Sequence, residues 1–487
     1  MNAHRDILNL RVQICAQPDD DALREALADA YATVGALDRA KFIQLQLQRS
    51  RLPRWDERAV ELELEERQLL ATHEEQWRRA ELPASDEITW GPFERGLVRS
   101  AWAEPGGIPL LANVPLEHLF VGWPWRRDPP LPRHPGAYSL TMVGAGDPAR
   151  LVRSPVFETT RSLTLLDGEF SRLDALVDHP LRALRIPHHH LQTAGLKALV
   201  EMPDPALEEL VLIGAPPEEA GSGFDAYYDP SFDERGAYAL ALWEGLASVK
   251  RLDLSRNRIG GDGLHVLLGS PWAAALRALS IRSIAAGSWH TDDSLAALSV
   301  STAHLEELDI SDNALDASGA EALAESPALA DLKLLFMRGV RSTHFLRLAT
   351  ASWIHELCVL EAGADALPSL LMKSPESLHT LVVHPGAARS LEDLPLLPSL
   401  RTLVILGVDL DDSWLHHLAR STAFPMLREL RVTPPHRFSE DALAAFCASG
   451  VAARLASFDF GEEHARLPRS PATAVGNGSY KGPHSWL

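Results

Sequence analysis

The feature that most constrains the fold is a leucine pattern that recurs along most of the 487-residue chain. Its clearest copy lies at residues 247–271, where Val249, Leu252 and Leu254 follow a fixed spacing and Asn257 comes three residues later. Apolar residues at this spacing predict a short strand, and the apolar residues after Asn257 fall at helical spacing. Neither element can bury its leucines alone, so such a unit is stable only when copies stack on one another.

Further copies occur at intervals of mostly about 21 to 29 residues, a period typical of solenoids built from short strands and helices. Two or three apolar residues with the same spacing mark each copy: Leu116-Leu119-Val121, Leu140-Met142, Leu163-Leu165, Leu181-Leu184-Ile186, Leu207-Leu210-Leu212, Leu276-Leu279-Ile281, Leu305-Leu308-Ile310, Leu329-Leu332-Leu334, Ile354-Leu357-Val359, Leu378-Leu381-Val383, Leu400-Leu403-Ile405, Leu427-Leu430-Val432 and Leu455-Phe458-Phe460. One copy alone would carry little weight, but this many in near register are hard to obtain by chance. We expect Leu252, Leu279, Leu308 and Leu332 to be neighbours in one interior column.

Two segments, Asn257–Leu264 (N-R-I-G-G-D-G-L) and Asn313–Ala320 (N-A-L-D-A-S-G-A), resemble the ribonuclease-inhibitor-like class of leucine-rich repeats. The resemblance implies an α/β solenoid, with a parallel concave sheet inside and helices on the convex side. Such a fold exposes leucines and strand edges at its ends, so a terminal cap is expected.

The first 80 residues have a different texture and predict a small helical bundle that could serve as the cap. We expect helices at Ala22–Val34, Asp38–Arg51 and Arg58–Gln76, the first of them started by the acidic residues after Pro18. The segment Ile88–Trp102 alternates like a hairpin that opens the sheet.

Residues 5–103 also resemble the bacterial repeat-companion domain that precedes leucine-rich repeats. The resemblance depends on the following positions: Pro18, Asp19, Asp20, Asp21, Arg24, Ala28, Asp29, Gly35, Arg39, Ala40, Phe42, Ile43, Leu45, Gln46 and Trp90–Gly96. That family has no established activity that could be transferred to this chain.

These patterns divide the chain into four parts. Residues 1–85 form the helical cap, residues 86–115 a capping hairpin and linker, residues 116–461 the solenoid, and residues 462–487 an irregular tail. The solenoid carries two insertions, at 122–135 and 214–236, the second required by the 42-residue interval between Leu210 and Leu252. Both insertions hold aromatic residues of the kind that dominate protein interfaces: Trp123, Trp125, Tyr227 and Tyr228.

Bulk properties narrow the classes of partner and compartment. The net charge of −20 argues against nucleic acid, because phosphate binding requires a basic surface. Three widely spaced cysteines predict a reducing compartment without disulfides, and the absence of a long apolar run predicts no membrane span. We therefore expect a cytoplasmic protein.

The sequence offers little catalytic chemistry, and we expect no enzyme activity, no metal and no cofactor. The run His188-His189-His190 falls where Asn257 falls in its repeat, so His189 is expected to bond a turn backbone. Cys358 and His384 would lie on adjacent strands, displaced by two residues, and so form a remote candidate for a thiolate dyad.

Strand alternation assigns the residues between the leucines to the concave face. The early repeats place there mixed, mostly small residues: His118, Phe120, Ser139, Thr141, Ser162, Thr164 and Arg185. The middle repeats place charges there: Arg251, Asp253, Arg282, Glu307, Asp309 and Lys333. An apolar strip follows, made of Leu335, Leu360, Val382, Val404 and Leu406, beside Cys358. This strip is either a docking surface or is covered by the tail at 462–487.

The function predicted from these residues is non-enzymatic recognition of a protein partner by the concave face and the two aromatic loops. The alternatives are a regulator of a bound enzyme and, remotely, an enzyme that uses Cys358. The partner and the oligomeric state are not identified by the sequence.

Overall fold

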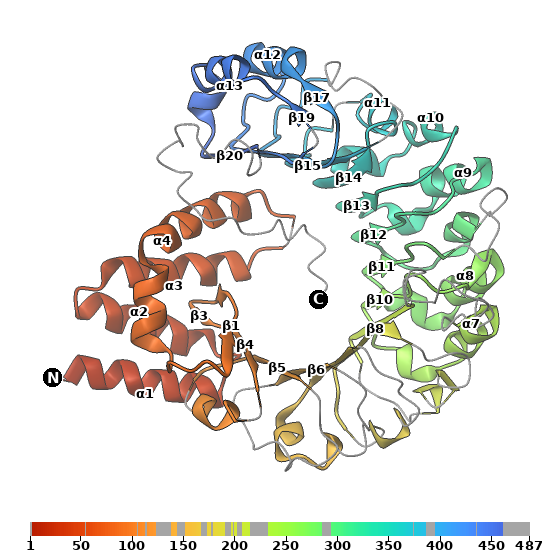
Figure 1. Ribbon diagram of the computed structural model, residues 1–487. Helices are drawn as coiled ribbons and strands as arrows, with labels where there is room; N and C mark the ends of the chain where they lie inside the picture. Colours follow the sequence, from red (N-terminus) through yellow and green to blue (C-terminus); the bar gives the residue numbers. More distant parts are fainter. Residues whose placement is uncertain are drawn as a thin grey trace.

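The computed structural model describes residues 2–53, 55–104, 106–112, 114–122, 138–143, 151–166, 173–176, 179–189, 196–197, 199–201, 207–214, 232–284, 294–373, 375–385, 395–434 and 436–460. Within these ranges the chain forms a helical region followed by a long curved sheet with helices outside it (Figure 1). None of the described helices has the length and apolar content needed to cross a bilayer.

The N-terminal region contains four helices: α1 (Asn2–Ala16), α2 (Asp21–Thr33), α3 (Leu37–Ser50) and α4 (Arg58–Glu81). The sequence predicted the last three; it missed α1, whose first turn has no acidic residue to mark its start. The expected acidic start of α2 is confirmed, because the Asp20 carboxylate accepts the Ala22 N–H. Helix α4 also extends past its predicted end and buries Trp77 within its last turns.

A 16-stranded sheet runs through the described part of the chain, with strands in sequence order. It opens with the antiparallel pair β1 (Ile88–Trp90) and β4 (Ser100–Ala103), as the predicted hairpin required, between which β2 (Phe93–Glu94) pairs with β3 (Leu97–Val98). The remaining strands are all parallel: β5 (His118–Gly122), β6 (Ser139–Val143), β7 (Ser162–Leu166), β8 (Ala183–His189), β9 (Glu209–Gly214), β10 (Arg251–Asp253), β11 (Ala278–Ser280), β12 (Glu307–Asp309), β13 (Leu334–Met337), β14 (Val359–Gly363), β15 (Thr380–His384), β16 (Thr402–Ile405), β18 (Glu429–Val432) and β20 (Ser457–Asp459).

The returning segments lie on the convex side of the sheet, as the repeat pattern predicted (Figure 1). The α-helices there are α7 (Glu234–Ala241), α8 (Gly260–Leu268), α9 (Ala317–Glu325), α10 (Phe345–Leu348), α11 (Leu367–Leu370), α12 (Asp412–Arg420) and α13 (Glu440–Cys447). The returning segments also contain short 3₁₀ helices, some of them following an α-helix: η1 (Ile108–Leu111), η2 (Pro155–Thr159), η3 (Leu173–Leu176), η4 (Glu244–Leu246), η5 (Pro271–Ala275), η6 (Ser294–Val300), η7 (Pro327–Leu329), η8 (Trp353–Glu356) and η9 (Ala452–Arg454). Two further short strands, β17 (Leu410–Asp411) and β19 (His436–Arg437), pair with each other in parallel.

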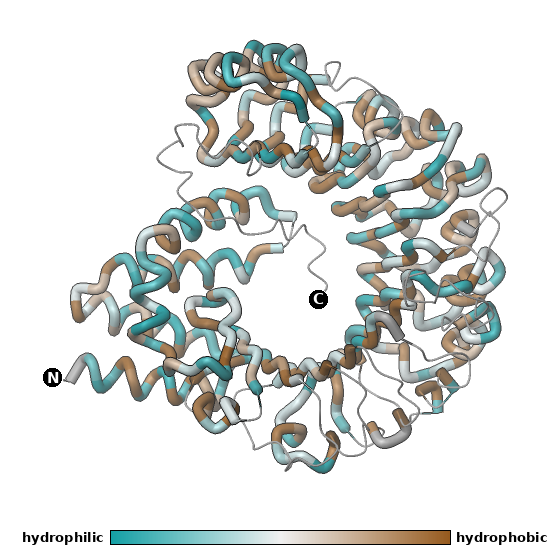
Figure 2. Tube along the Cα trace, in the orientation of Figure 1, coloured by the Kyte–Doolittle hydropathy of each residue, from teal (hydrophilic) through white to brown (hydrophobic). Residues whose placement is uncertain are grey.

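One column of buried leucines links the strands beneath the sheet, and Figure 2 shows hydrophobic residues concentrated along these strands. Its members are paired in register: Leu119, Leu140, Leu163, Leu184, Leu210, Leu252, Leu279, Leu308, Leu335, Leu360, Leu381, Leu403, Leu430 and Phe458. The predicted column is confirmed except at two repeats. There Leu335 and Leu360 take the positions expected for Leu332 and Leu357, so the predicted register was wrong by three residues.

Asparagine closes the turn after the strand in two repeats, as the pattern predicted. Asn313 Nδ2 donates to the carbonyl oxygens of Ile281 (2.7 Å) and Ile310 (2.9 Å), and its Oδ1 accepts the Ile284 N–H (3.0 Å). Asn257 makes the equivalent bonds two repeats earlier, in the turn after β10. Such a side chain satisfies backbone groups that would otherwise be buried without partners.

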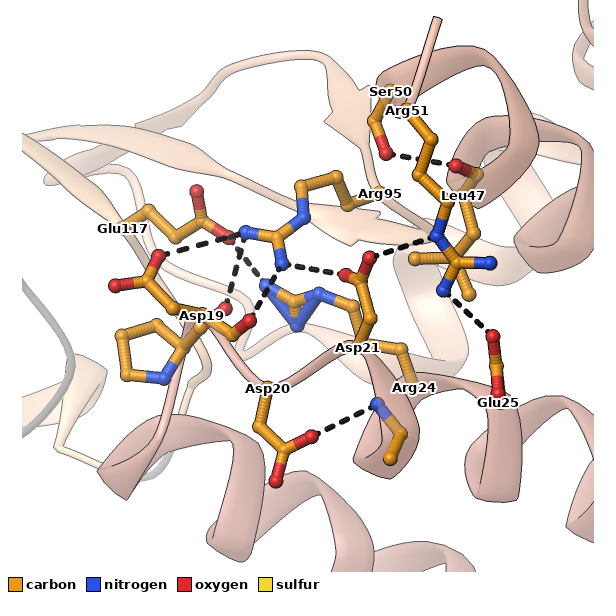
Figure 3. Close-up of polar contacts among 12 residues, drawn as sticks. Asp19, Asp20, Asp21, Arg24, Glu25, Leu47, Ser50, Arg51, Arg95 and Glu117 are labelled. Atoms are coloured by element: carbon orange, nitrogen blue, oxygen red, sulfur yellow. Dashed lines mark hydrogen bonds and ion pairs between the residues drawn. The ribbon is translucent and has the colours of Figure 1, made fainter.

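The helical region is joined to the first strands by a buried ion cluster around Glu117 (Figure 3). Arg24 of α2 pairs with Glu117, and their side chains are only 2% and 3% exposed. Arg95 approaches the same carboxylate at 3.2 Å and also reaches Asp21 at 2.6 Å. Arg99 adds a third contact to Glu117 at 3.0 Å. One carboxylate thus holds three guanidinium groups at the junction.

Helix α4 connects this junction to the far end of the sheet. Near its C-terminal end, Arg78 donates to the carbonyl oxygen of Gly91 at 2.9 Å, next to β1. Near the middle of α4, Arg67 pairs with Glu429 of β18 at 2.8 Å, and at its N-terminal end Glu57 pairs with Arg401 at 2.9 Å. The solenoid therefore curves until its last repeats meet the N-terminal helices, and the ribbon forms a closed ring (Figure 1).

The junction predicts a large effect of Glu117→Gln. Removing the carboxylate charge leaves the buried Arg24 guanidinium uncompensated, so we expect a loss of about 3 to 5 kcal/mol in the free energy of unfolding. Urea denaturation of the full chain measures it. Glu75→Gln, at an exposed ion pair with Arg79, should cost less than about 1 kcal/mol. Equal stability of Glu117→Gln and wild type would contradict the role assigned to the cluster.

Candidate protein-binding surface

Two rows of side chains face the inside of the ring, because residues alternate across each strand. The first concave row precedes the leucine column and consists of Ser100, His118, Ser139, Ser162, Ala183, Glu209, Arg251, Ala278, Glu307, Leu334, Val359, Thr380, Thr402, Glu429 and Ser457. The central concave row follows the column and consists of Trp102, Phe120, Thr141, Thr164, Arg185, Val211, Asp253, Ser280, Asp309, Phe336, Glu361, Val382, Val404, Arg431 and Asp459.

The early repeats carry an aromatic patch, which we define as Trp102, Phe120 and His118. The rings of Trp102 and Phe120 stack with centroids 6.2 Å apart, and His118 lies 4.4 Å from Phe120. Trp102 remains 37% exposed. His118 and Phe120 were predicted for this face; Trp102 was not, although its position in the predicted hairpin follows the same alternation.

His118 is held rigidly in the neutral form. Its Nδ1 lies 2.8 Å from the Ser139 hydroxyl and its Nε2 lies 2.7 Å from the Thr141 hydroxyl. Burial, together with the positive charges of Arg185 and Arg99, lowers the pKa of His118 to about 3. The patch is therefore an uncharged, ordered surface at neutral pH.

Arg185 borders the aromatic patch on the central concave row. It forms a two-point ion pair with Glu209, at 2.8 and 2.6 Å, and donates to the Ser162 hydroxyl at 2.7 Å. Ser162, one of the small polar residues predicted for this face, thus contacts the Arg185 guanidinium group, which remains partly exposed.

The predicted charged middle of the concave face is partly neutralised by ion pairs, one of which lies within the predicted set. Arg251 reaches over the small Ala278 to Glu307, at 3.1 Å. Arg282 pairs with Asp312 at 3.0 Å rather than with another predicted site residue. This arrangement makes the middle repeats a partly neutralised surface.

Asp253 and Asp309 are buried within the charged middle. Asp253 accepts the Ser255 N–H at 2.9 Å, and Asp309 accepts the Ser311 N–H at 2.9 Å. Burial raises the pKa of Asp253 to about 6, with the nearby Asp309 charge acting in the same direction.

Lys333 does not lie in the concave rows. It precedes β13, and its ammonium pairs with the exposed Glu356 at 2.8 Å. Lys333 belongs to an edge column of residues that precede successive strands, joined by backbone hydrogen bonds: Lys333, Cys358, His379, Arg401 and Arg428. The prediction for Lys333 was wrong because it depended on the shifted register.

The residues that form the apolar part of the concave face also differ from the prediction. Leu335 and Leu360 point into the interior column, so they are not surface residues. Val382 and Val404 do lie on the central concave row but are 0% and 1% exposed, and Leu406 is half-buried. In β13 and β14, Leu334, Phe336 and Val359 occupy the concave rows in place of Leu335 and Leu360.

The N-terminal region covers this part of the inner face. Trp55 packs against the cluster of Leu334, Phe336 and Val359. His379 Nε2 donates to the Trp55 carbonyl oxygen at 2.8 Å, and Arg401 pairs with Glu57 and Glu61 at 2.9 and 3.1 Å. The pattern allowed either an open docking surface or a cover by the tail at 462–487, and nothing in the sequence indicated Trp55.

The proposed Cys358–His384 dyad is not formed. His384 is level with Gly363, five residues beyond Cys358, which corresponds to roughly 17 Å along the strand. His384 contacts Glu361 at 2.7 Å, while Cys358 Sγ donates to the Glu356 carbonyl oxygen. Burial raises the pKa of the Cys358 thiol, which opposes thiolate formation. Within the described ranges, no group of three or more potential ligand side chains is arranged to hold a metal.

Some predicted contact residues cannot be placed. Trp123, Trp125, Tyr227 and Tyr228 lie outside the described residues, as does the tail at 462–487, and so do the side chains of His188, His189 and His190.

Comparison with known proteins supports the repeat pattern. A family model described as "Leucine Rich repeat" matches residues 245–268 and 303–324, around the two copies that the sequence marks best. No curated protein matches the chain. Among solved structures, an internalin from Listeria monocytogenes is 16% identical, with a TM-score of 0.36, and the match covers 74% of this chain and 87% of the internalin. A chain in the yeast Rad7 and Elc1 complex is also 16% identical, with a TM-score of 0.37 and coverage of 60% and 80%.

The buried carboxyl of Asp253 predicts a pH-dependent stability. Its folded pKa of about 6 lies above the ordinary value near 4, so the folded state binds a proton that the unfolded state releases between these pH values. This contribution is favourable at low pH and is lost as pH rises through 6. We expect Asp253→Asn to stabilise the protein at pH 7.5 by about 2 to 3 kcal/mol and much less at pH 4.5.

Urea denaturation at the two pH values tests the Asp253 prediction. Asn keeps the acceptor for the Ser255 N–H, so the substitution isolates the effect of charge. Asp86→Asn, at an exposed turn, should change little at either pH. A gain for Asp253→Asn that is the same at both pH values would contradict the titration.

Proposed function

We propose that this leucine-rich-repeat protein recognises a protein partner on the inner face of its sheet and does not itself catalyse a reaction. Stacked repeats create an extended concave surface, the use to which such folds are generally put. The observation that carries the proposal is the aromatic patch. A partly exposed tryptophan, stacked on a phenylalanine at the inner face, is the kind of group that dominates binding energy in protein interfaces.

The aromatic patch is suited to binding because its side chains are already ordered. His118 is fixed by two hydroxyl groups, and Trp102 and Phe120 hold each other by stacking. An ordered surface loses little conformational entropy when a partner binds. Arg185 beside it supplies a charged group whose guanidinium is fixed by Glu209, which favours geometric specificity.

The proposal also covers further contact residues, the location of the protein and the identity of its N-terminal region. The loop residues Trp123, Trp125, Tyr227 and Tyr228 would add contacts to the partner, as would the charged middle of the inner face. Three free cysteines favour a cytoplasmic location. We also propose that residues 1–85 are a bacterial repeat-companion domain that caps the solenoid at 116–461.

The aromatic patch predicts a loss of partner binding in Trp102→Ala. Because hot-spot tryptophans contribute about 2 kcal/mol or more, we expect the affinity to fall by at least about thirtyfold. The full chain, carrying an affinity tag, captures its partner from the native host, and the dissociation constant is then measured with the purified pair.

A matched control is Leu242→Ala, which truncates an 84% exposed leucine at the end of α7 on the convex side. This variant should bind like wild type. A partner that binds Trp102→Ala and wild type equally would remove the aromatic patch from the interface and overturn the proposal.

A further inference from the structure

We propose that the C-terminal part of the inner face is a recognition surface for an acidic helix preceded by an aromatic residue. In this structure the chain's own residues 55–61 occupy that surface, and a partner segment of the same chemistry would replace them. The proposal concerns different residues from the aromatic patch, and it stands independently of whether that patch binds a protein.

The surface has a basic side formed by the edge column. His379, Arg401 and Arg428 precede three neighbouring strands, and backbone hydrogen bonds of 2.8 Å link Arg401 to His379 and Arg428 to Arg401. Arg401 binds the carboxylates of both Glu57 and Glu61, while Arg428 Nε lies 3.8 Å from Glu61. Acidic residues one helical turn apart therefore match the spacing of this basic side.

The surface has an apolar side formed by the concave rows. Leu334, Phe336 and Val359 cluster where β13 and β14 meet, and Trp55 packs against them. Apolar side chains on the inner face of a solenoid require a cover, since a contiguous exposed patch would promote association. Trp55 thus covers the apolar side of the surface, while Glu57 and Glu61 of the same segment pair with its basic side.

The surface has more donor groups than the chain's own segment satisfies. Arg401 Nε and Arg428 Nε are both buried and neither has a hydrogen-bond partner among the described residues. Buried donors without partners are costly, so a ligand with additional carboxylates would bind more favourably than residues 55–61 do. Arg401 and Arg428 therefore have donor capacity left for the additional carboxylates of an acidic partner.

The bound segment is also held loosely by its own region. The start of α4 is capped from within the segment, where the Asp56 carboxylate accepts the Arg58 N–H at 2.9 Å, and Leu64 is the first residue of the helix that is buried. Glu57 and Glu61 are 54% and 45% exposed in their ion pairs, and exposed pairs contribute little to stability. The first turn of α4 can therefore leave the wall while the rest of the helix stays packed.

Cys358 provides a reporter of this exchange, because it packs against the same apolar cluster as Trp55. We compare the rate at which a thiol reagent labels Cys358 in a Cys447→Ser background, Cys15 being buried. Glu57→Lys/Glu61→Lys should release the segment and accelerate labelling at least about tenfold. Burial and the Glu57 charge both raise the pKa of the Cys358 thiol, so removing that charge would by itself change the labelling rate at neutral pH. The labelling rates are therefore compared at a high pH, where the thiol is fully ionised in every variant.

Two further variants make the labelling result specific. Glu65→Lys/Glu75→Lys places the same charge change on exposed positions of α4 and should leave the rate within about twofold of wild type. Adding Arg401→Glu and Arg428→Glu to the released variant should restore slow labelling, because the ion pairs are re-formed with reversed signs. A released variant that labels at the wild-type rate overturns the proposal.

Recognition is tested with a fluorescent peptide of residues 50–70 added to the full-length protein. It should bind Glu57→Lys/Glu61→Lys at least about tenfold more tightly than wild type, whose surface is occupied. A peptide carrying Trp55→Ala, Glu57→Lys and Glu61→Lys should not bind. Equal binding to both proteins, or no binding to either, overturns the proposal. So does a wild-type dimer in light scattering that dissociates in the released variant, because a second copy would then be the occupant.

Discussion

Burial of one leucine column beneath a parallel sheet is the interaction on which the rest of this structure depends. Each strand is only a few residues long, and each strand from β5 to β18 within the 16-stranded sheet contributes one fully buried leucine to the column, worth about 2 kcal/mol. No strand would be stable alone, but each pairs in register with two neighbours, and the gain accumulates along the chain. Everything that faces inside the ring is positioned by this column, because alternation assigns the residues on either side of each leucine to the concave face. The inner surface is therefore as well defined as the register of the leucines.

This dependence explains how much could be predicted from the sequence. Where one face of a strand is apolar and the other polar, as in β10 to β12, the register follows from the pattern alone. In β13 the residues Leu334, Leu335, Phe336 and Met337 are all apolar, so the pattern allows more than one register. The structure gives the physical reason, since Leu334 and Phe336 are covered by Trp55 and need not be polar. Trp55 lies about 280 residues earlier in the chain, and no local pattern could connect it to those strands.

The helical region is joined to the two ends of the sheet by ion pairs that differ in their burial. At the first junction Arg24 and Glu117 are almost completely buried, so separating them would leave uncompensated charges in a low-dielectric interior. At the second, Arg401 meets Glu57 and Glu61, both about half exposed, and water can replace either partner at little cost. Residues 57–61 are thus only lightly attached to the sheet, whereas the rest of the helical region is fixed to β1–β5 by the buried cluster and to β18 by the largely buried pair of Arg67 and Glu429. Buried and exposed pairs look alike in the sequence, because burial depends on how the chain closes.

Ring closure also constrains the number of repeats. The 16 strands of the sheet, spaced by about 4.8 Å, extend about 72 Å along the inner wall. Helix α4 has 24 residues, and from Glu57, which pairs with Arg401, to Arg78, which reaches Gly91, it covers about 32 Å of the remaining arc. A helix of fixed length can bridge only one width of gap, so the ion pairs at its N-terminal end require this length of sheet and this curvature. Adding or removing one repeat would move Arg401 by about one strand spacing relative to Glu57, beyond the reach of an ion pair. The repeat number is therefore part of what brings residues 55–61 onto the inner face.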